Sequence, residues 1–383
     1  MRIRLVASIP VLALATVASA GTQTTELSLG KPAATIAEPY SEIVGLAELR
    51  DGRVMVSDRI ERTYSIADFG NGERRTIGRN GIGPTEYQVP FGPIRWRGDT
   101  LLGYDPQNRR HLKITDAGLI VGSHSFPAPK VGGINGFATP RAVDRSGRIY
   151  WDTPIIQMQP VVERLMQARI VRWLPGSDAV EEVMQFNDHG EFEHHLRYRA
   201  FPQTDAWVIA EDGRIGILSA FDYRLRWYRN GAVVETGSPV PWTPLRITRA
   251  ERDAFRERKA LEPASGVSMT GSVAQTPPRL GMERARAAWP DSLFPEVMPP
   301  FEAGGVMLAP GGDLWVKRTG SARESAAKVD VLDGRGQLRG TIRLPPSTKL
   351  LAVGSEWIYL VRTDDNGLQT LERYAYPAPV RPR

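Results

Sequence analysis

Alternation of apolar and polar residues is clearest between Glu42 and Pro90, where short apolar runs are separated by turn residues. The turns Asp51-Gly52 and Gly70-Asn71-Gly72 are of the kind that tolerates the positive φ of tight hairpins. This stretch therefore predicts four antiparallel strands and an exit loop, over Ile43–Leu49, Val54–Ser57, Arg62–Phe69, Arg74–Ile77 and Gly78–Pro90. One such sheet cannot bury both of its faces, so it predicts stacking against similar sheets.

The turn between the first and second strands recurs along the chain. Its glycines are Gly52, Gly98, Gly147, Gly213, Gly312 and Gly354. Most of these are separated by roughly 40 to 50 residues, the repeat length of propeller blades, and the longer gaps mark insertions. The pattern predicts an all-β fold: a six-bladed β-propeller of four-stranded antiparallel blades.

The exit loop carries a more specific signal. Gly81-Ile82-Gly83-Pro84, Glu86, Tyr87 and Pro90 resemble the junction between blades of NHL-type and related secreted bacterial six-bladed β-propellers, although Thr85 stands where that family usually has glycine. The resemblance implies a propeller for nearly the whole chain after residue 20. It implies no activity, because this architecture hosts binding proteins and several unrelated enzymes.

The last blade is one strand short at the carboxyl end of the chain, where Leu350–Val353, Trp357–Arg362 and Leu368–Tyr374 are its strands. We expect the missing strand to come from Thr25–Leu29, or alternatively from Ala33–Ala37. Such closure removes an exposed sheet edge. The propeller is then expected over residues 21–376, with a carboxyl-terminal tail over 377–383.

An insertion over residues 241–300 separates blades 4 and 5. Thr248-Arg249-Ala250-Glu251 is a capping box, in which the hydroxyl and the carboxylate satisfy each other's free backbone donors, and it predicts a charged helix to about Leu261. Glu283–Trp289 predicts a second short helix. The insertion could cover one face of the disc as a basic groove.

The amino terminus has the features of a secretory signal over residues 1–20: two arginines, an apolar run from Leu5 to Val17, and Ala18-Ser19-Ala20. The apolar run is too short for a membrane span. Without the signal the chain is nearly neutral, and its arginines are dispersed among acids, which disfavours nucleic-acid binding. We expect a periplasmic or secreted protein that acts as a monomer.

An aspartate recurs after the second strand, at Asp58, Asp105, Asp152 and Asp222, often followed by an arginine (Arg62, Arg109 and Arg224). A ring of carboxylates around the pore is one interpretation. Because a functional site normally breaks a repeat, we favour the structural one, in which aspartate accepts backbone N–H groups in the turn and arginine pairs locally.

His189, His194 and His195 form the densest histidine group and are the candidate metal ligands, for zinc or a similar ion. A solvated loop between blades is the favoured interpretation, since the spacing lacks the glutamate of zinc-protease helices. A calcium site of the lactonase type needs six or more oxygens, which the predicted inner strands do not visibly supply. No cysteine and no Gly-x-Ser-x-Gly nucleophile motif is present.

Binding residues on a rigid scaffold tend to lie on inserted loops. The candidate ligand-binding residues are therefore in the insertion and in irregular parts of blades 4 and 6: Arg252, Arg256, Asp222, Tyr223, Arg226, Arg362, Asp364, Asp365 and Asn366. We interpret the chain as an exported, non-catalytic module, without cofactor, that binds a protein segment or a small ligand. The alternative is a metal-dependent propeller hydrolase or lyase, lactonase-like, with calcium or zinc held by carboxylates at the pore mouth.

Overall fold

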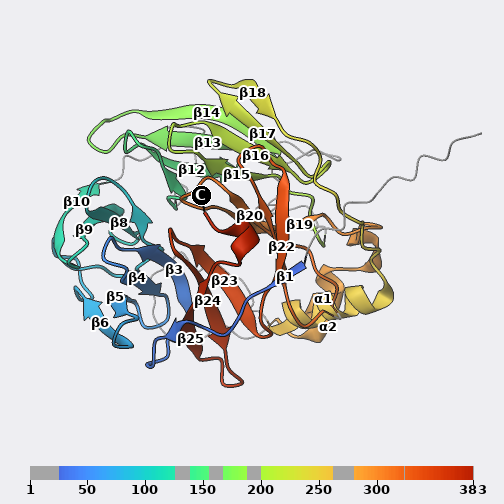
Figure 1. The fold of residues 1–383 in the computed structure, drawn as a ribbon, viewed down its shortest axis with the longest axis horizontal. Coiled ribbons are helices and arrows are strands. Elements are labelled where there is room, and N and C mark those ends of the chain that lie inside the picture. Colours follow the sequence, from blue (N-terminus) through green and yellow to red (C-terminus); the bar gives the residue numbers. More distant parts are fainter. Residues whose placement is uncertain are drawn as a thin grey trace, which may run out of the picture.

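The structure is a computed structural model, and it describes residues 26–125, 139–154, 167–187, 200–261, 280–322 and 324–382. Six sheets of antiparallel strands fan around a common centre, so the molecule is a six-bladed β-propeller, as the repeat of turns predicts (Figure 1). The predicted signal segment and His189, His194 and His195 lie outside the described residues.

Each blade has four strands in a simple meander, numbered here from the centre outward. Blade 1 is β3 (Ile43–Glu48), β4 (Val54–Asp58), β5 (Thr63–Asp68) and β6 (Glu73–Ile77); blade 2 is β7 (Ile94–Arg95), β8 (Thr100–Asp105), β9 (Arg110–Thr115) and β10 (Ile120–Ser125); blade 3 is β11 (Ala142–Val143), β12 (Ile149–Pro154), β13 (Gln167–Trp173) and β14 (Val180–Asn187). Blade 4 is β15 (Ala206–Ile209), β16 (Ile215–Ser219), β17 (Arg224–Arg229) and β18 (Ala232–Thr236); blade 5 is β19 (Phe301–Leu308), β20 (Leu314–Arg318), β21 (Lys328–Leu332) and β22 (Leu338–Arg343); blade 6 is β23 (Thr348–Val353), β24 (Trp357–Thr363) and β25 (Gln369–Ala375), completed by β2 (Ala34–Thr35).

The hydrophobic core is divided among the six seams between neighbouring blades. Each of the six buried clusters joins residues of two adjacent blades, for example Met55 and Tyr64 of blade 1 with Leu101 and Ile114 of blade 2. The inner strands also contact one another in a closed cycle, from β3 through β7, β11, β15, β19 and β23 back to β3. Every blade therefore depends on both neighbours for its burial, as a sheet with two apolar faces requires.

The amino-terminal segment supplies two outer strands to two different blades. β2 pairs antiparallel with β25 and completes blade 6, which confirms the alternative donor Ala33–Ala37. The other expected donor, Thr25–Leu29, is wrong for this role, because β1 (Glu26–Ser28) pairs parallel with β22 and adds a fifth strand to blade 5. At the other end of the chain, η3 (Ala378–Val380) follows β25, and Val380 is buried in the cluster between blades 5 and 6.

The recurrent aspartates are turn residues in blades 1 and 2. Asp58 accepts the backbone N–H groups of Ser41, Glu42, Ile60 and Glu61. Asp105 likewise accepts those of Gln88 and Val89. The expected arginine pairing is found elsewhere, between Asp152 and Arg141 and between Asp222 and Arg224, whereas Arg62 and Arg109 occupy turn positions with positive φ. The structural interpretation of the repeat therefore holds for the first two blades.

A buried carboxylate joins blades 4 and 5. Asp330 in β21 is fully buried and accepts three hydrogen bonds, from Tyr223 Oη at 2.7 Å, Arg318 Nε at 2.6 Å and Thr341 Oγ1 at 2.6 Å. Burial raises the pKa of Tyr223, and the neighbouring charge of Asp330 raises it further. All three donors lose their partner if the carboxylate is removed.

We expect Asp330→Ala to lower the free energy of unfolding by about 3–5 kcal/mol, because it leaves a buried guanidinium and two buried hydroxyls without their acceptor. Urea unfolding followed by tryptophan fluorescence measures this loss. Asp51→Ala is the control, since Asp51 pairs with Arg53 in an exposed turn and its removal should cost less than about 1 kcal/mol. Equal losses in the two variants would contradict the role of Asp330.

Candidate functional site

The insertion between β18 and β19 contains α1 (Arg249–Leu261), α2 (Met282–Ala288) and η2 (Asp291–Leu293), in agreement with the two predicted helices. α1 begins after Thr248, whose Oγ1 accepts the N–H of Glu251 at 3.3 Å, and Arg258 and Lys259 in its last turn suit the negative end of the helix dipole. In Figure 1 both helices lie at the rim of the disc, beside β1. The expectation that the insertion covers a face of the disc is thus wrong, because the chain folds back on itself beyond blade 5.

An aromatic cluster holds the insertion together. The buried ring of Phe255 in α1 lies 5.6 Å from Trp289, 5.4 Å from Phe294 and 5.0 Å from Phe201, measured between ring centroids. Arg256 is also buried, and it donates to the carbonyl of Trp289 at 2.9 Å and to Asp291 at 2.6 Å. The segment that carries these side chains is consequently a packed unit with its own small core.

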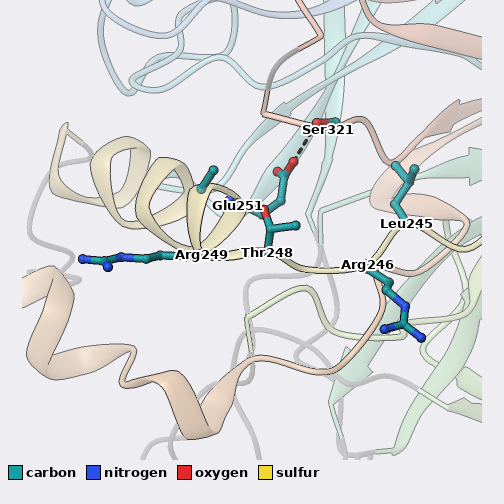
Figure 2. A pocket seen from close by; sticks show the side chains of 7 residues that line it. Leu245, Arg246, Thr248, Arg249, Glu251 and Ser321 are labelled. Atoms are coloured by element: carbon teal, nitrogen blue, oxygen red, sulfur yellow. Dashed lines mark hydrogen bonds between the residues drawn. The ribbon is translucent and has the colours of Figure 1, made fainter.

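Glu251 anchors this unit to blade 5. Its buried carboxylate accepts the hydroxyl of Ser321 at 2.6 Å and the N–H of Ala322 at 2.8 Å, and Figure 2 shows the first of these bonds. The predicted capping box is therefore half correct. Thr248 caps the helix, but the carboxylate reaches the loop between β20 and β21 instead of the Thr248 backbone.

A surface hollow of about 420 Å³ lies over this anchor. It is lined by Leu245, Arg246, Thr248, Arg249, Ala250, Glu251 and Ser321. Figure 2 shows Arg246 and Arg249 extending from its rim on different sides of Thr248. Their side chains are 82% and 90% exposed, and their nearest carboxylates, Glu296 and Asp253, are 3.9 and 3.7 Å away. Such exposed pairs contribute little energy, so both guanidinium groups can turn to a ligand.

Two of the predicted binding residues lie beside this hollow, within the insertion. Arg252 and Arg256 both reach Asp291, at 3.4 and 2.6 Å. The Arg256 hydrogen bond is the main reason that the pKa of Asp291 lies below its ordinary value. Arg252 and Arg256 therefore stabilise the insertion, and the exposed charges at the hollow belong to their neighbours Arg246 and Arg249.

The predicted residues of blade 4 form a separate local group. Asp222 pairs with Arg226 at 2.6 Å; burial raises the pKa of this carboxyl, but the Arg226 hydrogen bond and charge outweigh burial and leave the pKa lowered. Tyr223 is fully buried and bonded to Asp330, so its hydroxyl belongs to the seam between blades.

The predicted residues of blade 6 are likewise occupied locally. Arg362 pairs with Glu372 at 2.7 Å, and Asp364 accepts the N–H groups of Asn366 and Leu368 in its own turn. Asp365 and Asn366 are exposed. No hydrogen bond or ion pair between described residues links the blade 4, blade 6 and insertion groups, so the structure does not bring them into one site.

Leu245, Arg246 and Ser321 are lining residues that the sequence analysis did not single out. The helix-start signal at Thr248 marks the neighbourhood of the first two. Ser321 is 70 residues from Glu251 in the chain, and no local pattern announces their contact.

Metal ligands and membrane spans were also sought in the described part of the chain. It contains no group of three or more histidine, aspartate or glutamate side chains close enough to hold a metal ion. None of its helices has both the length and the apolar character to cross a bilayer.

Comparison with known proteins identifies similar solved structures only; no family model and no curated protein matches the chain. A calcium-binding regucalcin from Agrobacterium tumefaciens is 11% identical, covering 94% of this chain and 99% of that one, with a TM-score of 0.41. A DUF4221 family member from Bacteroides vulgatus is 10% identical over 91% and 95% (TM-score 0.47), and a provisionally named exported protein from Bacteroides fragilis is 10% identical over 93% and 95% (TM-score 0.46). Similarity this low carries no inference about ligand or chemistry.

Proposed function

We propose that the chain is an exported, monomeric, non-catalytic binding module on an NHL-like propeller, which recognises a protein segment at the hollow of the insertion. The observation that carries the proposal is a hollow of about 420 Å³ whose rim holds two exposed, weakly paired arginines. This volume is within the usual range of ligand sites.

The chemistry of the lining defines the class of segment. Leu245 and Ala250 provide apolar surface, whereas Arg246 and Arg249 provide guanidinium groups that match a carboxylate in geometry and charge. A short segment that carries an aspartate or glutamate next to an apolar residue satisfies both. The anchored Glu251 and the aromatic cluster of Phe255 keep the hollow in shape, which reduces the ordering cost of binding.

Fluorescence anisotropy with a panel of short labelled peptides of varied charge tests this function. Acidic and apolar peptides should bind, more weakly as salt rises, and the double variant Arg246→Glu/Arg249→Glu should lower their affinity at least tenfold. The control is Arg145→Glu, because Arg145 is 77% exposed and pairs with the exposed Glu211, as Arg246 pairs with Glu296. A panel without charge preference, or equal loss in the control, would overturn the proposal.

The alternative function is metal-dependent hydrolysis or lysis of the lactonase-like kind. Stoichiometric calcium or zinc in dialysed protein, together with hydrolysis of a lactone that a chelator abolishes, would replace the binding proposal by this alternative. An Arg246→Glu/Arg249→Glu variant that keeps such activity would show that the hollow is not its site.

A further inference from the structure

A second, smaller hollow of about 170 Å³ lies at the seam between blades 3 and 4. Arg148 and Arg172 of blade 3 and Arg229 of blade 4 line it, and Asp212 is the only acidic residue among its described lining residues. The hollow includes Gly213 in the first turn of blade 4 and Asn230 in the last. Since the insertion leaves a blade at the opposite ends of its strands, this hollow is distinct from the site proposed above.

A buried charge at this place breaks the repeat of the blades. The turn after the first strand is closed by the same two backbone hydrogen bonds at Leu49, Asp144, Ala210 and Ala309. Three of these residues are apolar, and only blade 3 has a carboxylate there, with Asp144 buried. Burying a charge is costly unless it is well paired, so the turn itself gives no reason for this choice.

The Asp144 carboxylate holds other groups in place. It accepts Arg148 Nε at 2.8 Å, Tyr150 Oη at 2.9 Å and the N–H of Arg148 at 3.0 Å. In other turns an exposed aspartate accepts the equivalent N–H, as Asp51 does for Arg53. The additional consequence of burying Asp144 is that the guanidinium of Arg148 is fixed at the edge of the hollow.

The three arginines retain most of their donors. Within the described residues each reaches a carboxylate through one nitrogen only: Arg148 Nε with Asp144, Arg172 Nε with Glu181 at 2.7 Å, and Arg229 Nη2 with Asp212 at 2.8 Å. A guanidinium has five N–H donors, of which the two pairs on its edges suit the oxygens of a phosphate or carboxylate. The hollow is thus a polar recess with an excess of fixed positive charge.

We propose that this recess binds a phosphate group. Its volume corresponds to about five water molecules at roughly 30 Å³ each, which accommodates a single phosphate but not a larger molecule. Arg148, Arg172 and Arg229 would each donate to the phosphate oxygens. The bound group is either free phosphate or the phosphate end of a small ester whose remainder lies in solvent.

Isothermal titration of the full chain with inorganic phosphate, in phosphate-free buffer of low ionic strength, tests the site. Binding is expected, and Arg172→Gln or Arg229→Gln should each lower the affinity about tenfold or more, as loss of a charge-assisted hydrogen bond does. The control is Arg53→Gln: Arg53 occupies the position of Arg148 in blade 1, and the two side chains are 29% and 32% exposed. This control should bind phosphate as the original chain does.

A second titration with glycerol 1-phosphate separates the two sources. Tighter binding of the ester indicates a phosphate end of a larger molecule, and tighter binding of inorganic phosphate indicates the free ion; both support the site. Thermal melts of the variants check that they are folded. Absence of binding by either probe, or equal affinity in Arg172→Gln, Arg229→Gln and Arg53→Gln, would overturn the proposal.

Discussion

A chain that begins at Glu38 is expected to lose its cooperative unfolding transition, because it lacks the strand that closes blade 6. The lost segment includes β2 and the fully buried Ile36, which packs in the cluster between blades 6 and 1. It also includes the N–H groups of Ala33 and Ile36, which bond the carbonyls of Arg373 and Leu371 in β25. Removal exposes a central strand of the blade as an edge and opens the ring at one seam.

A chain that begins at Lys31 is the matched control. It lacks β1 but keeps β2, so blade 5 still has its own four strands and the ring stays closed. Its midpoint of thermal unfolding should fall by a few degrees, through the loss of Leu27 packing and of the Glu26–Arg343 ion pair. Circular dichroism melts and light scattering of both chains measure the difference. A cooperative, unshifted melt of the chain from Glu38 would contradict closure by β2.

Single substitutions probe the same seam without a deletion. Ile36→Ala should cost about 2–5 kcal/mol of unfolding free energy, the usual range for truncating a fully buried isoleucine. Leu27→Ala, at a partly buried position beside β22, should cost less. The comparison separates the strand that closes the ring from the strand that only widens a blade.

The fold could be predicted from the sequence because its signals are local. Gly52, Gly147, Gly213 and Gly312 all have positive φ in the turn where the repeat places them, and a residue without a Cβ is the usual solution there. The amino-terminal strands were harder to assign. β1 and β2 have three and two residues, so hydrophobic alternation hardly distinguishes them, and the parallel pairing of β1 with β22 depends on contacts more than 300 residues apart in the chain.

The candidate site could be predicted only in outline. The capping residue Thr248 and the helix that follows are local features and were found. The partners of the polar residues were not, because they are distant in sequence: Tyr223 bonds Asp330 across 107 residues, and Glu251 bonds Ser321 across 70. A polar residue in an irregular segment is therefore an ambiguous signal, since the sequence does not show whether the fold has already supplied its partner.

The stability of the protein should fall between pH 6.5 and pH 3 in a way that depends on His111 in β9. This side chain is fully buried between blades 2 and 3, with ring centroids 5.2 Å from Tyr104 and 6.0 Å from Trp173. Burial, and to a lesser extent the charge of His124 on the neighbouring strand, lower the pKa of His111 to about 3. Burial also lowers the pKa of His124, and the charge of Lys113 lowers it further.

The sign of the effect follows from proton binding. Above an unfolded pKa of about 6.5 neither state binds a proton at His111, so the residue contributes no pH dependence there. Below this value the unfolded chain takes up a proton that the folded chain refuses, and the free energy of unfolding falls by up to about 1.4 kcal/mol per pH unit until the folded pKa is reached. At pH 4.5 the loss amounts to about 3 kcal/mol.

Urea unfolding of the original chain and of His111→Phe, from pH 7.5 to pH 4.5, measures this term. Carboxylates titrate equally in both chains and cancel in the difference, so the variant should show a shallower loss whatever its stability at pH 7.5. The imidazole NMR signals of His111 should also stay unshifted down to about pH 4, since the folded side chain remains neutral. Parallel pH profiles for the two chains, or an imidazole that titrates near pH 6.5, would mean that acid opens the seam between blades 2 and 3 before the protein unfolds.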